Sequence, residues 1–393
     1  MGKKYFSDLS SNTFLLALAS LFADISTEML YPVLPVFLTQ TLGAGANVVG
    51  LIEGIAQAVQ NIVQGLSGWL SDKLQRRKPI AIVGYLLAAI AKPLIGLATV
   101  WTGVLAARSL DRLGSGTRSA PRDALIAASA DEANRGKAFG LEGVGDNLGA
   151  FLGPLLAIAL LGLFYFSIQS IFLLAFIPGL LATLMVLFVR EQPVAASAKA
   201  KLDLSFRAFP RSYWKFLFVT ALFGIGNSSN AFLIMRTSEL GASLTMTIFI
   251  YALFNLVAAL VSYPAGYLSD RFGRKGVLLF AFVVFFGVYL GFGFATDTIV
   301  IGMLFILYGV FQGIFRTVGK ALASDYVPAE LRASGVGWYT ATVGVSGLGA
   351  SIIAGELWME VSPSAAFYYG AGAALLGIFA LAFLVSGKPV TRS

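Results

Sequence analysis

Long apolar runs constrain this chain more than any other feature. The 393-residue sequence contains twelve stretches of about 20 mostly apolar residues, the length that an α-helix needs to cross a lipid bilayer. The sequence therefore predicts helices at 14–38, 47–71, 79–99, 101–124, 138–162, 167–189, 212–236, 244–268, 276–295, 298–321, 333–358 and 363–386. Because lipid offers no hydrogen-bond partners to the backbone, we expect an all-α membrane protein.

Composition excludes several function classes. Only 12% of the residues are charged, about half the share in soluble domains, and the net charge of +8 sits between the apolar runs rather than on one face. We therefore expect no nucleic-acid partner. The chain has no histidine and no cysteine, which excludes imidazole and thiolate metal sites and leaves carboxylates as the only proton carriers. No cofactor, no metal and no enzymatic activity are expected.

Positive charge predicts the orientation in the membrane. Most Lys and Arg residues lie at the termini or in alternate loops, among them Arg118 and Arg122, whereas the opposite loops QTLGAGAN and FYFS carry none. Loops rich in Lys and Arg stay on the cytoplasmic side. We therefore expect a multi-pass protein of the inner (cytoplasmic) membrane with both termini in the cytoplasm.

The sequence repeats itself after about 200 residues. GWLSDKLQRRK at 68–78 returns as GYLSDRFGRK at 266–275, and DALIAASADEANRGKAFG from Asp123 pairs with KALASDYVPAELRASGVG from Lys320. Two matches at nearly one spacing indicate two related halves, as in transporters built from repeats. The predicted division is an N-terminal six-helix bundle at 1–189, a cytoplasmic linker at 190–211 and a C-terminal six-helix bundle at 212–393.

These loops resemble the major facilitator superfamily, and in particular its twelve-helix proton-coupled drug and solute exporters. Its loop signature G-x-L-S/A-D-R/K-x-G-R-R/K is met in both halves, apart from Gln75 in place of a glycine. The resemblance implies two pseudo-symmetric bundles and a charged clasp that gates the cytoplasmic side, with Asp123 as partner of the first copy. A plain positive-inside anchor is the alternative. The expected gating residues are Gly68, Asp72, Arg76, Arg77, Asp123, Asp270, Arg271 and Arg274.

The predicted helix at 138–162 is similar to the family's antiporter signature. Gly140, Gly149, Gly153 and Pro154 match it, whereas Ala157 and Ile158 replace its last glycine pair. Glycines let helices approach closely and a proline bends them. The resemblance implies export in exchange for protons, and the alternative is a tight packing seam without a bearing on direction.

Charges within the predicted spans mark a candidate coupling site, because they are expensive in hydrocarbon. Asp24 and Glu28, Arg108 and Arg112, and Glu142 and Asp146 are each four residues apart, so each pair shares one helix face. Asp24, Lys92, Arg108, Arg112 and Asp146 lie near mid-depth, where one polar cluster can form. Either a carboxylate alternates between a proton and Arg108 or Arg112, or permanent ion pairs hold the helices together. The predicted proton-coupling residues are Asp24 as first choice, then Glu28, Asp146 and Glu142.

The second half has amides and aromatic rings where the first has charges. Amides and aromatic rings together can bind an amphiphilic organic molecule through hydrogen bonds and ring contacts. The alternative for the aromatic residues is contact with lipid. Across both halves the predicted substrate-binding residues are Asp24, Glu28, Glu53, Gln57, Lys92, Arg108, Arg112, Asn227, Asn230, Asn255, Gln312, Arg316 and Trp338.

The pattern as a whole predicts a secondary active transporter working by alternating access. The favoured form is a proton-coupled exporter of a small organic solute or drug, with small-molecule substrate, protons and the lipid bilayer as partners, acting as a monomer. A proton symporter or importer of a small organic anion is the alternative, with Lys92, Arg108 and Arg112 as anion ligands. A divalent metal exporter using hard oxygen ligands ranks third.

Overall fold

The computed structural model describes residues 9–74, 76–131, 134–191, 209–328 and 331–385. Within these ranges every regular element is a helix. The chain forms two compact units, Met1–Leu34 with Ile62–Ala200 and Pro35–Asn61 with Lys201–Ser393. Helix α4 (Ala46–Leu74) therefore runs through both units. Most of the predicted linker, residues 192–208, lies outside the described residues, and the predicted division at 190–211 stays a prediction.

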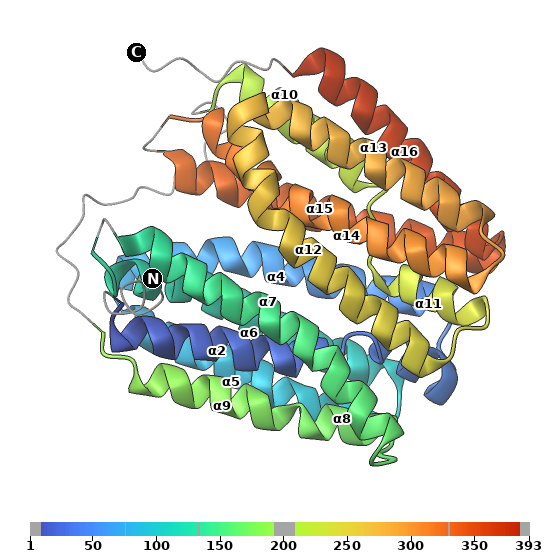
Figure 1. The fold of residues 1–393 in the computed structure, drawn as a ribbon, viewed down its shortest axis with the longest axis horizontal. Coiled ribbons are helices and arrows are strands. Elements are labelled where there is room, and N and C mark those ends of the chain that lie inside the picture. The colour runs from blue at the N-terminus through green and yellow to red at the C-terminus, as the bar shows by residue number, and fades with distance from the viewer. Residues whose placement is uncertain (1–8, 75, 132–133, 192–208, 329–330, 386–393) are drawn as a thin grey trace. The chain divides into compact units, whose positions relative to one another are not determined.

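The first unit is a bundle in which charged and small residues face inward. Helix α2 packs against α7 and α9, and α5 packs against α6, α8 and α9 (Figure 1). Ser10 and Ser167 cap the starts of α2 and α8, because their hydroxyl groups accept hydrogen bonds from free backbone N–H groups of the first turn. Besides its part of α4, the unit contains α2 (Ser11–Glu28), α5 (Arg77–Gly96), α6 (Trp101–Ala128), α7 (Arg135–Gly162), α8 (Ile168–Leu174) and α9 (Phe176–Phe188).

The second unit has an aromatic interior. Helix α12 packs against α14, α13 against α14 and α16, and α10 against α15 and α16. The Phe223 ring stacks on the Phe282 ring at 3.8 Å between centroids, and Phe285 stacks on Tyr289 at 3.9 Å. The helices are α10 (Arg211–Gly224), α11 (Ala231–Glu239), α12 (Leu244–Phe272), α13 (Arg274–Phe294), α14 (Thr298–Asp325), α15 (Arg332–Glu360) and α16 (Pro363–Leu384), preceded by α3 (Leu34–Val36) and the π-helix Phe37–Thr41.

Each predicted span corresponds to one helix or to consecutive helices. The predicted span 14–38 is broken after Glu28, and 212–236 is broken at residues 225–230, where Asn and Ser side chains compete for the backbone. Eight described helices are both long and apolar enough to cross a membrane on composition alone. Helix α6 is not among them, because six charged residues lie along it. The prediction of an all-α membrane fold is confirmed.

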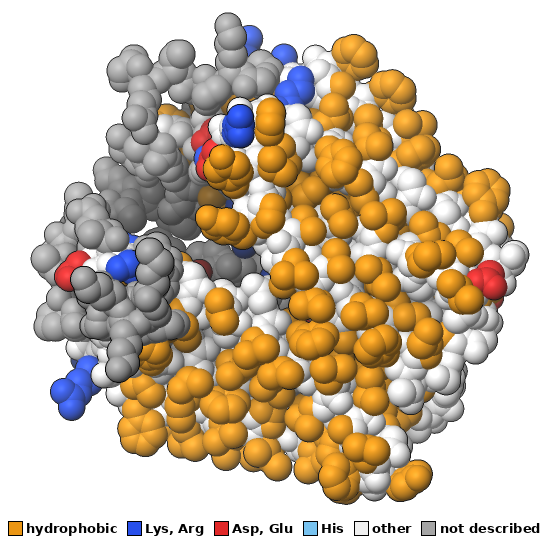
Figure 2. All heavy atoms as spheres, in the orientation of Figure 1, with side chains coloured by type: hydrophobic (Ala, Val, Ile, Leu, Met, Phe, Trp, Pro, Cys, Tyr) orange, Lys and Arg blue, Asp and Glu red, His pale blue; other side chains and the backbone are white. Residues whose placement is uncertain are grey.

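The outside of the protein is suited to lipid. Large apolar side chains such as Leu163, Leu260 and Phe383 are exposed. On the face seen in Figure 2, hydrophobic side chains cover most of the described surface and charged side chains are few. Burial of charge inside the units and exposure of apolar groups reverse the usual soluble arrangement, as expected for a bundle whose solvent is the bilayer.

Candidate functional site

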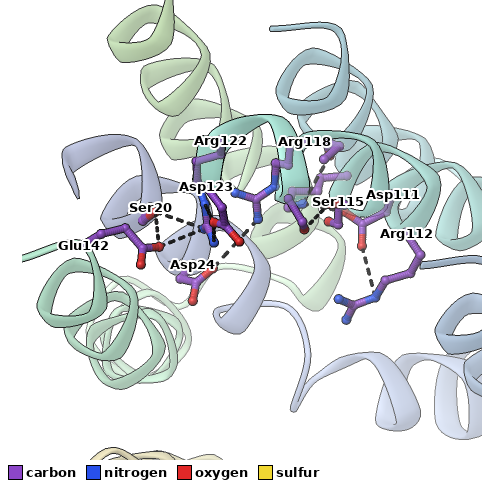
Figure 3. Close-up of polar contacts among 12 residues, drawn as sticks. Ser20, Asp24, Asp111, Arg112, Ser115, Arg118, Arg122, Asp123 and Glu142 are labelled. Carbon is purple, nitrogen blue, oxygen red and sulfur yellow. Dashed lines mark hydrogen bonds and ion pairs between the residues drawn. The ribbon is translucent and has the colours of Figure 1, made fainter. Parts of the chain in front are cut away.

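Helix α6 carries the polar residues that organise the first unit. Its charged and hydroxyl side chains recur every three or four residues, which places them along one stripe of the helix (Figure 3). The stripe consists of Arg108, Asp111, Arg112, Ser115, Arg118 and Arg122. Arg118 is 8% exposed and lies inside α6, as does Arg122. The prediction that these two arginines belong to a loop is therefore wrong, because α6 continues to Ala128.

One carboxylate in this stripe holds several cations. The Asp111 carboxylate accepts a hydrogen bond from Lys92 Nζ at 2.7 Å and another from Arg108 Nη1 at 2.8 Å. Arg112 Nε lies 3.8 Å from the same carboxylate. Lys92, Arg108 and Asp111 are fully buried, and the Arg108 guanidinium lies 5.4 Å from the centre of the Tyr31 ring. This Asp111 cluster joins α5 to α6 through buried ion pairs.

A second group surrounds Asp24 on α2. Arg118 Nη2 lies 3.9 Å from Asp24 Oδ1, an ion-pair distance too long for a hydrogen bond. The carboxyl of Asp146, on α7, lies close enough to interact with the Asp24 carboxyl. The Asp24 side chain is 20% exposed, so the group is less enclosed than the Asp111 cluster. Two carboxyl groups therefore meet here beside one arginine that is not hydrogen-bonded to Asp24.

A third group lies along the stripe at Arg122. Its guanidinium donates to Asp123 Oδ1 at 2.9 Å and to Glu142 Oε1 at 2.9 Å. Buried Ser20, on α2, donates to the same Glu142 oxygen at 2.8 Å. Figure 3 shows the Ser20, Arg122 and Glu142 side chains converging from α2, α6 and α7. This arrangement ties α2, α6 and α7 together through hydrogen bonds to one Glu142 oxygen.

The predicted mid-depth cluster is thus resolved into two neighbouring groups. Lys92, Arg108 and Arg112 gather on Asp111, whereas Asp24 and Asp146 gather beside Arg118. The cation that faces Asp24 is Arg118, which sequence reasoning assigned to a loop. The signal was present, because Arg118 continues the three-and-four spacing that starts at Arg108. Glu28 lies half-buried one turn beyond Asp24 on α2.

The remaining substrate-binding predictions fall in the second unit or in the part of α4 grouped with it. Asn227 accepts a hydrogen bond from Tyr308 at 3.3 Å, and the Trp338 ring packs edge-on against Trp214. Arg316 is exposed on α14. The other predicted residues are Glu53, which is buried, Gln57, which is exposed, and Asn230, Asn255 and Gln312, which are half-buried.

The repeated loops make the same backbone contacts in both units. Arg77 Nη1 donates to the Ala124 carbonyl at 3.5 Å, and Arg274 Nη1 donates to the Ala321 carbonyl at 2.7 Å. In the second unit Arg274 also pairs with Asp325 at 2.8 Å and with Asp270 at 3.3 Å. These contacts fasten the start of α13 to the end of α14.

Two details of the predicted clasp differ from expectation. In the first unit Asp123 pairs with its neighbour Arg122, which the resemblance did not imply. In the second unit the carboxylate is Asp325, which sequence reasoning missed because its counterpart in the repeat is Ala128. Gly68 faces Ala120, Arg76 precedes α5, and Arg271 lies near the Phe272 ring. The Asp72 side chain lies outside the described residues.

The glycines of α7 bring that helix onto the backbone of α2. A Cβ atom at Gly145 would lie 2.4 Å from the Ala17 carbonyl oxygen, and one at Gly149 would lie 2.5 Å from that of Leu21. One at Gly153 would lie 2.9 Å from Met29 N. These three positions are four residues apart and form one face, which seats Asp24 and Asp146 beside each other. Gly145 was not predicted, and a Cβ atom at Gly140 would meet nothing within 4 Å among the described residues.

Comparison with known proteins agrees with this architecture. The family model described as Major Facilitator Superfamily matches residues 16–235 and 216–393. An uncharacterised MFS-type transporter of Methanocaldococcus jannaschii is 35% identical over 383 residues, which is 96% of each chain. A probable 4-methylmuconolactone transporter of Cupriavidus pinatubonensis is 28% identical, over 81% of this chain and 76% of its own.

Solved structures show the same fold. The crystal structure of the nucleoside transporter NupG superposes with a TM-score of 0.78 at 15% identity, covering 95% of this chain and 98% of its own. The human organic anion transporter MFSD10 reaches 0.65 at 17% identity, covering 94% and 98%. The matched family model spans both repeats and nearly the whole sequence. The chain therefore belongs to the Major Facilitator Superfamily of membrane transporters.

Proposed function

We propose that this chain is a proton-coupled transporter that exports a small organic solute by alternating access. The observation that carries the proposal is the Asp24 group, in which two carboxyl groups and one arginine meet on three helices. A carboxylate pair in a poorly solvated place holds a shared proton readily, because two negative charges so close repel each other. Such a pair is a proton carrier in a chain without histidine.

Proton exchange at this group changes its charge balance. With Asp24 ionised, the carboxylate attracts the Arg118 guanidinium 3.9 Å away; with Asp24 protonated, that attraction is lost. Helices α2 and α7 lie in backbone contact through Gly149, so a shift at Asp24 is transmitted to α7. Small shifts of this kind drive rigid-body changes when a bundle has two packings.

The Asp111 cluster favours the proton-coupled exporter over the alternative, an importer of a small organic anion. As ligands for an organic anion, Lys92 and Arg108 would have to leave Asp111, to which both fully buried side chains are bonded. The third predicted anion ligand, Arg112, is held less closely, at 3.8 Å. Breaking a buried pair is expensive, by about 3–5 kcal/mol. The anion importer therefore has less support than a transporter coupled at Asp24. The named relatives suit small organic solutes, since one is called a nucleoside transporter and another a 4-methylmuconolactone transporter.

Export is the proposed direction, supported by the antiporter-type glycines of α7 and by Pro154 within the same helix. The proposed setting is the inner membrane with both termini cytoplasmic, and the proposed working unit is one chain, since it contains both repeats. The Arg274 and Asp325 pair is the proposed cytoplasmic clasp of the second repeat.

The test is transport in proteoliposomes with a pH-sensitive dye inside. The panel contains lipophilic cations, organic anions, nucleosides and sugars, assayed with wild type and Asp24→Asn. The matched control is Asp297→Asn, which changes the same atoms at an exposed cap of α14, where asparagine also caps. We expect solute-dependent proton movement in the antiport sense for wild type and control, and none for Asp24→Asn.

Other outcomes would change the proposal. Solute and proton movement in the same direction would make the protein a symporter. Unchanged proton movement in Asp24→Asn would contradict the role of Asp24, and Asp146→Asn would then test its neighbour.

A further inference from the structure

A small cavity lies inside the first unit, between α2, α5, α6 and α9. Its polar lining consists of Ser26, Thr27, Tyr85, Lys92 and Arg118, and the rest of its wall is alanine and glycine. The cavity has a volume of about 10 Å³, so it takes no more than one small occupant. It lies within one bundle, and of the groups in the proton exchange proposed above only Arg118 borders it.

Two buried donors line this cavity without a partner among the described residues. Arg118 is 8% exposed, and its Nε and Nη1 atoms make no hydrogen bond; the Tyr85 hydroxyl is likewise unbonded in a side chain 1% exposed. The Arg118 guanidinium lies over the Tyr85 ring at 4.5 Å, so both groups border the same space. A buried donor left unbonded costs about 1–3 kcal/mol, which favours a bound acceptor.

Charge decides which acceptor fits. The described lining contains two cations, Lys92 and Arg118, and no carboxylate. Lys92 is bonded to Asp111 at 2.7 Å, whereas the carboxylate nearest to Arg118 is Asp24 at 3.9 Å. A water molecule would satisfy hydrogen bonds but would leave the Arg118 charge weakly compensated in a poorly solvated place. An anion does both.

We propose that this cavity binds one small monovalent anion of halide size, such as chloride, between Arg118 and Tyr85. The Arg118 Nε–H and Nη1–H groups and the Tyr85 hydroxyl donate to it, and Lys92 adds positive charge from α5. The anion holds α5 and α6 together at the point where Arg118 also faces Asp24. This site does not depend on the direction or the substrate of transport.

The test measures binding rather than transport. Purified full-length protein is unfolded by heat in rising chloride, with gluconate, which is too large for the cavity, keeping the ionic strength constant. We expect the melting midpoint to rise with chloride and to saturate, because a ligand bound only by the folded state stabilises it by mass action. Bromide should act in the same way, and crystals soaked in bromide should show an anomalous peak beside Arg118.

Two variants make the result specific. Tyr85→Phe removes one hydroxyl and keeps the ring under Arg118. It should raise the half-saturating chloride concentration by roughly 10- to 100-fold, the size of one hydrogen bond to a charged group. Tyr263→Phe makes the same change on a side chain 85% exposed and should alter nothing. Identical midpoints in chloride and gluconate, a chloride effect unchanged in Tyr85→Phe, or an ordered water alone in the cavity would each overturn the proposal.

Discussion

Replacing Asp111 by asparagine tests whether the Asp111 cluster is structural. The carboxylate is 0% exposed and makes two direct ion pairs, at 2.7 Å to Lys92 and 2.8 Å to Arg108. Asparagine keeps the size but removes the charge, so two buried cations lose a counter-ion. Removing one partner of a buried pair destabilises a protein by about 3–5 kcal/mol, which is roughly 150- to 5,000-fold in the unfolding equilibrium.

The matched control is Asp270→Asn, the same substitution at a side chain 70% exposed that pairs with Arg274 at 3.3 Å. An exposed pair contributes about 0–1 kcal/mol. The measurement is equilibrium unfolding of purified protein by SDS titration in mixed micelles, with helix content as readout. Equal losses of stability in Asp111→Asn and Asp270→Asn would refute the reasoning, because burial would then make no difference.

Two further predictions concern packing and orientation. Gly149→Ala should destabilise the protein by about 1–3 kcal/mol in the same unfolding assay, because its Cβ would lie 2.5 Å from the Leu21 carbonyl oxygen. The control Gly140→Ala should not, because its Cβ would meet no described atom within 4 Å. An unchanged stability of Gly149→Ala would contradict the α2–α7 contact. The chain lacks cysteine, so single cysteines can report the orientation in the membrane. Ala44→Cys, in a loop proposed to be outside, should react in intact cells with a membrane-impermeant maleimide, and Asp131→Cys, in a loop proposed to be cytoplasmic, only after permeabilisation. The reverse pattern would invert the proposed topology.

The fold was largely readable from the sequence. Runs of about 20 apolar residues have one stable solution in lipid, which is why the predicted spans correspond to helices. Breaks within spans were harder to foresee. Residues 225–230 interrupt a helix because four polar side chains and one glycine weaken it locally, and the mean hydropathy of the whole predicted span conceals this.

The candidate site was only partly predictable. Charge and spacing singled out Asp24, Lys92 and Arg108, but not which cation faces which carboxylate. Sequence reasoning counted Arg118 among the loop cations because Lys and Arg mark cytoplasmic loops, although the predicted span 101–124 contains it. Asp325 was missed for another reason, since the repeat has no acidic residue at the matching position.

By itself, the sequence determined a helical membrane protein with two related halves, because hydrophobic length and repeated charged loops are local properties of the chain. Only the tertiary structure decided that Asp111 pairs with Lys92 and Arg108, whereas Asp24 lies beside Arg118 and Asp146. The physical reason is that pairing inside a bundle depends on how closely helices approach. In this protein that approach is set by glycines on α7 that meet the backbone of α2.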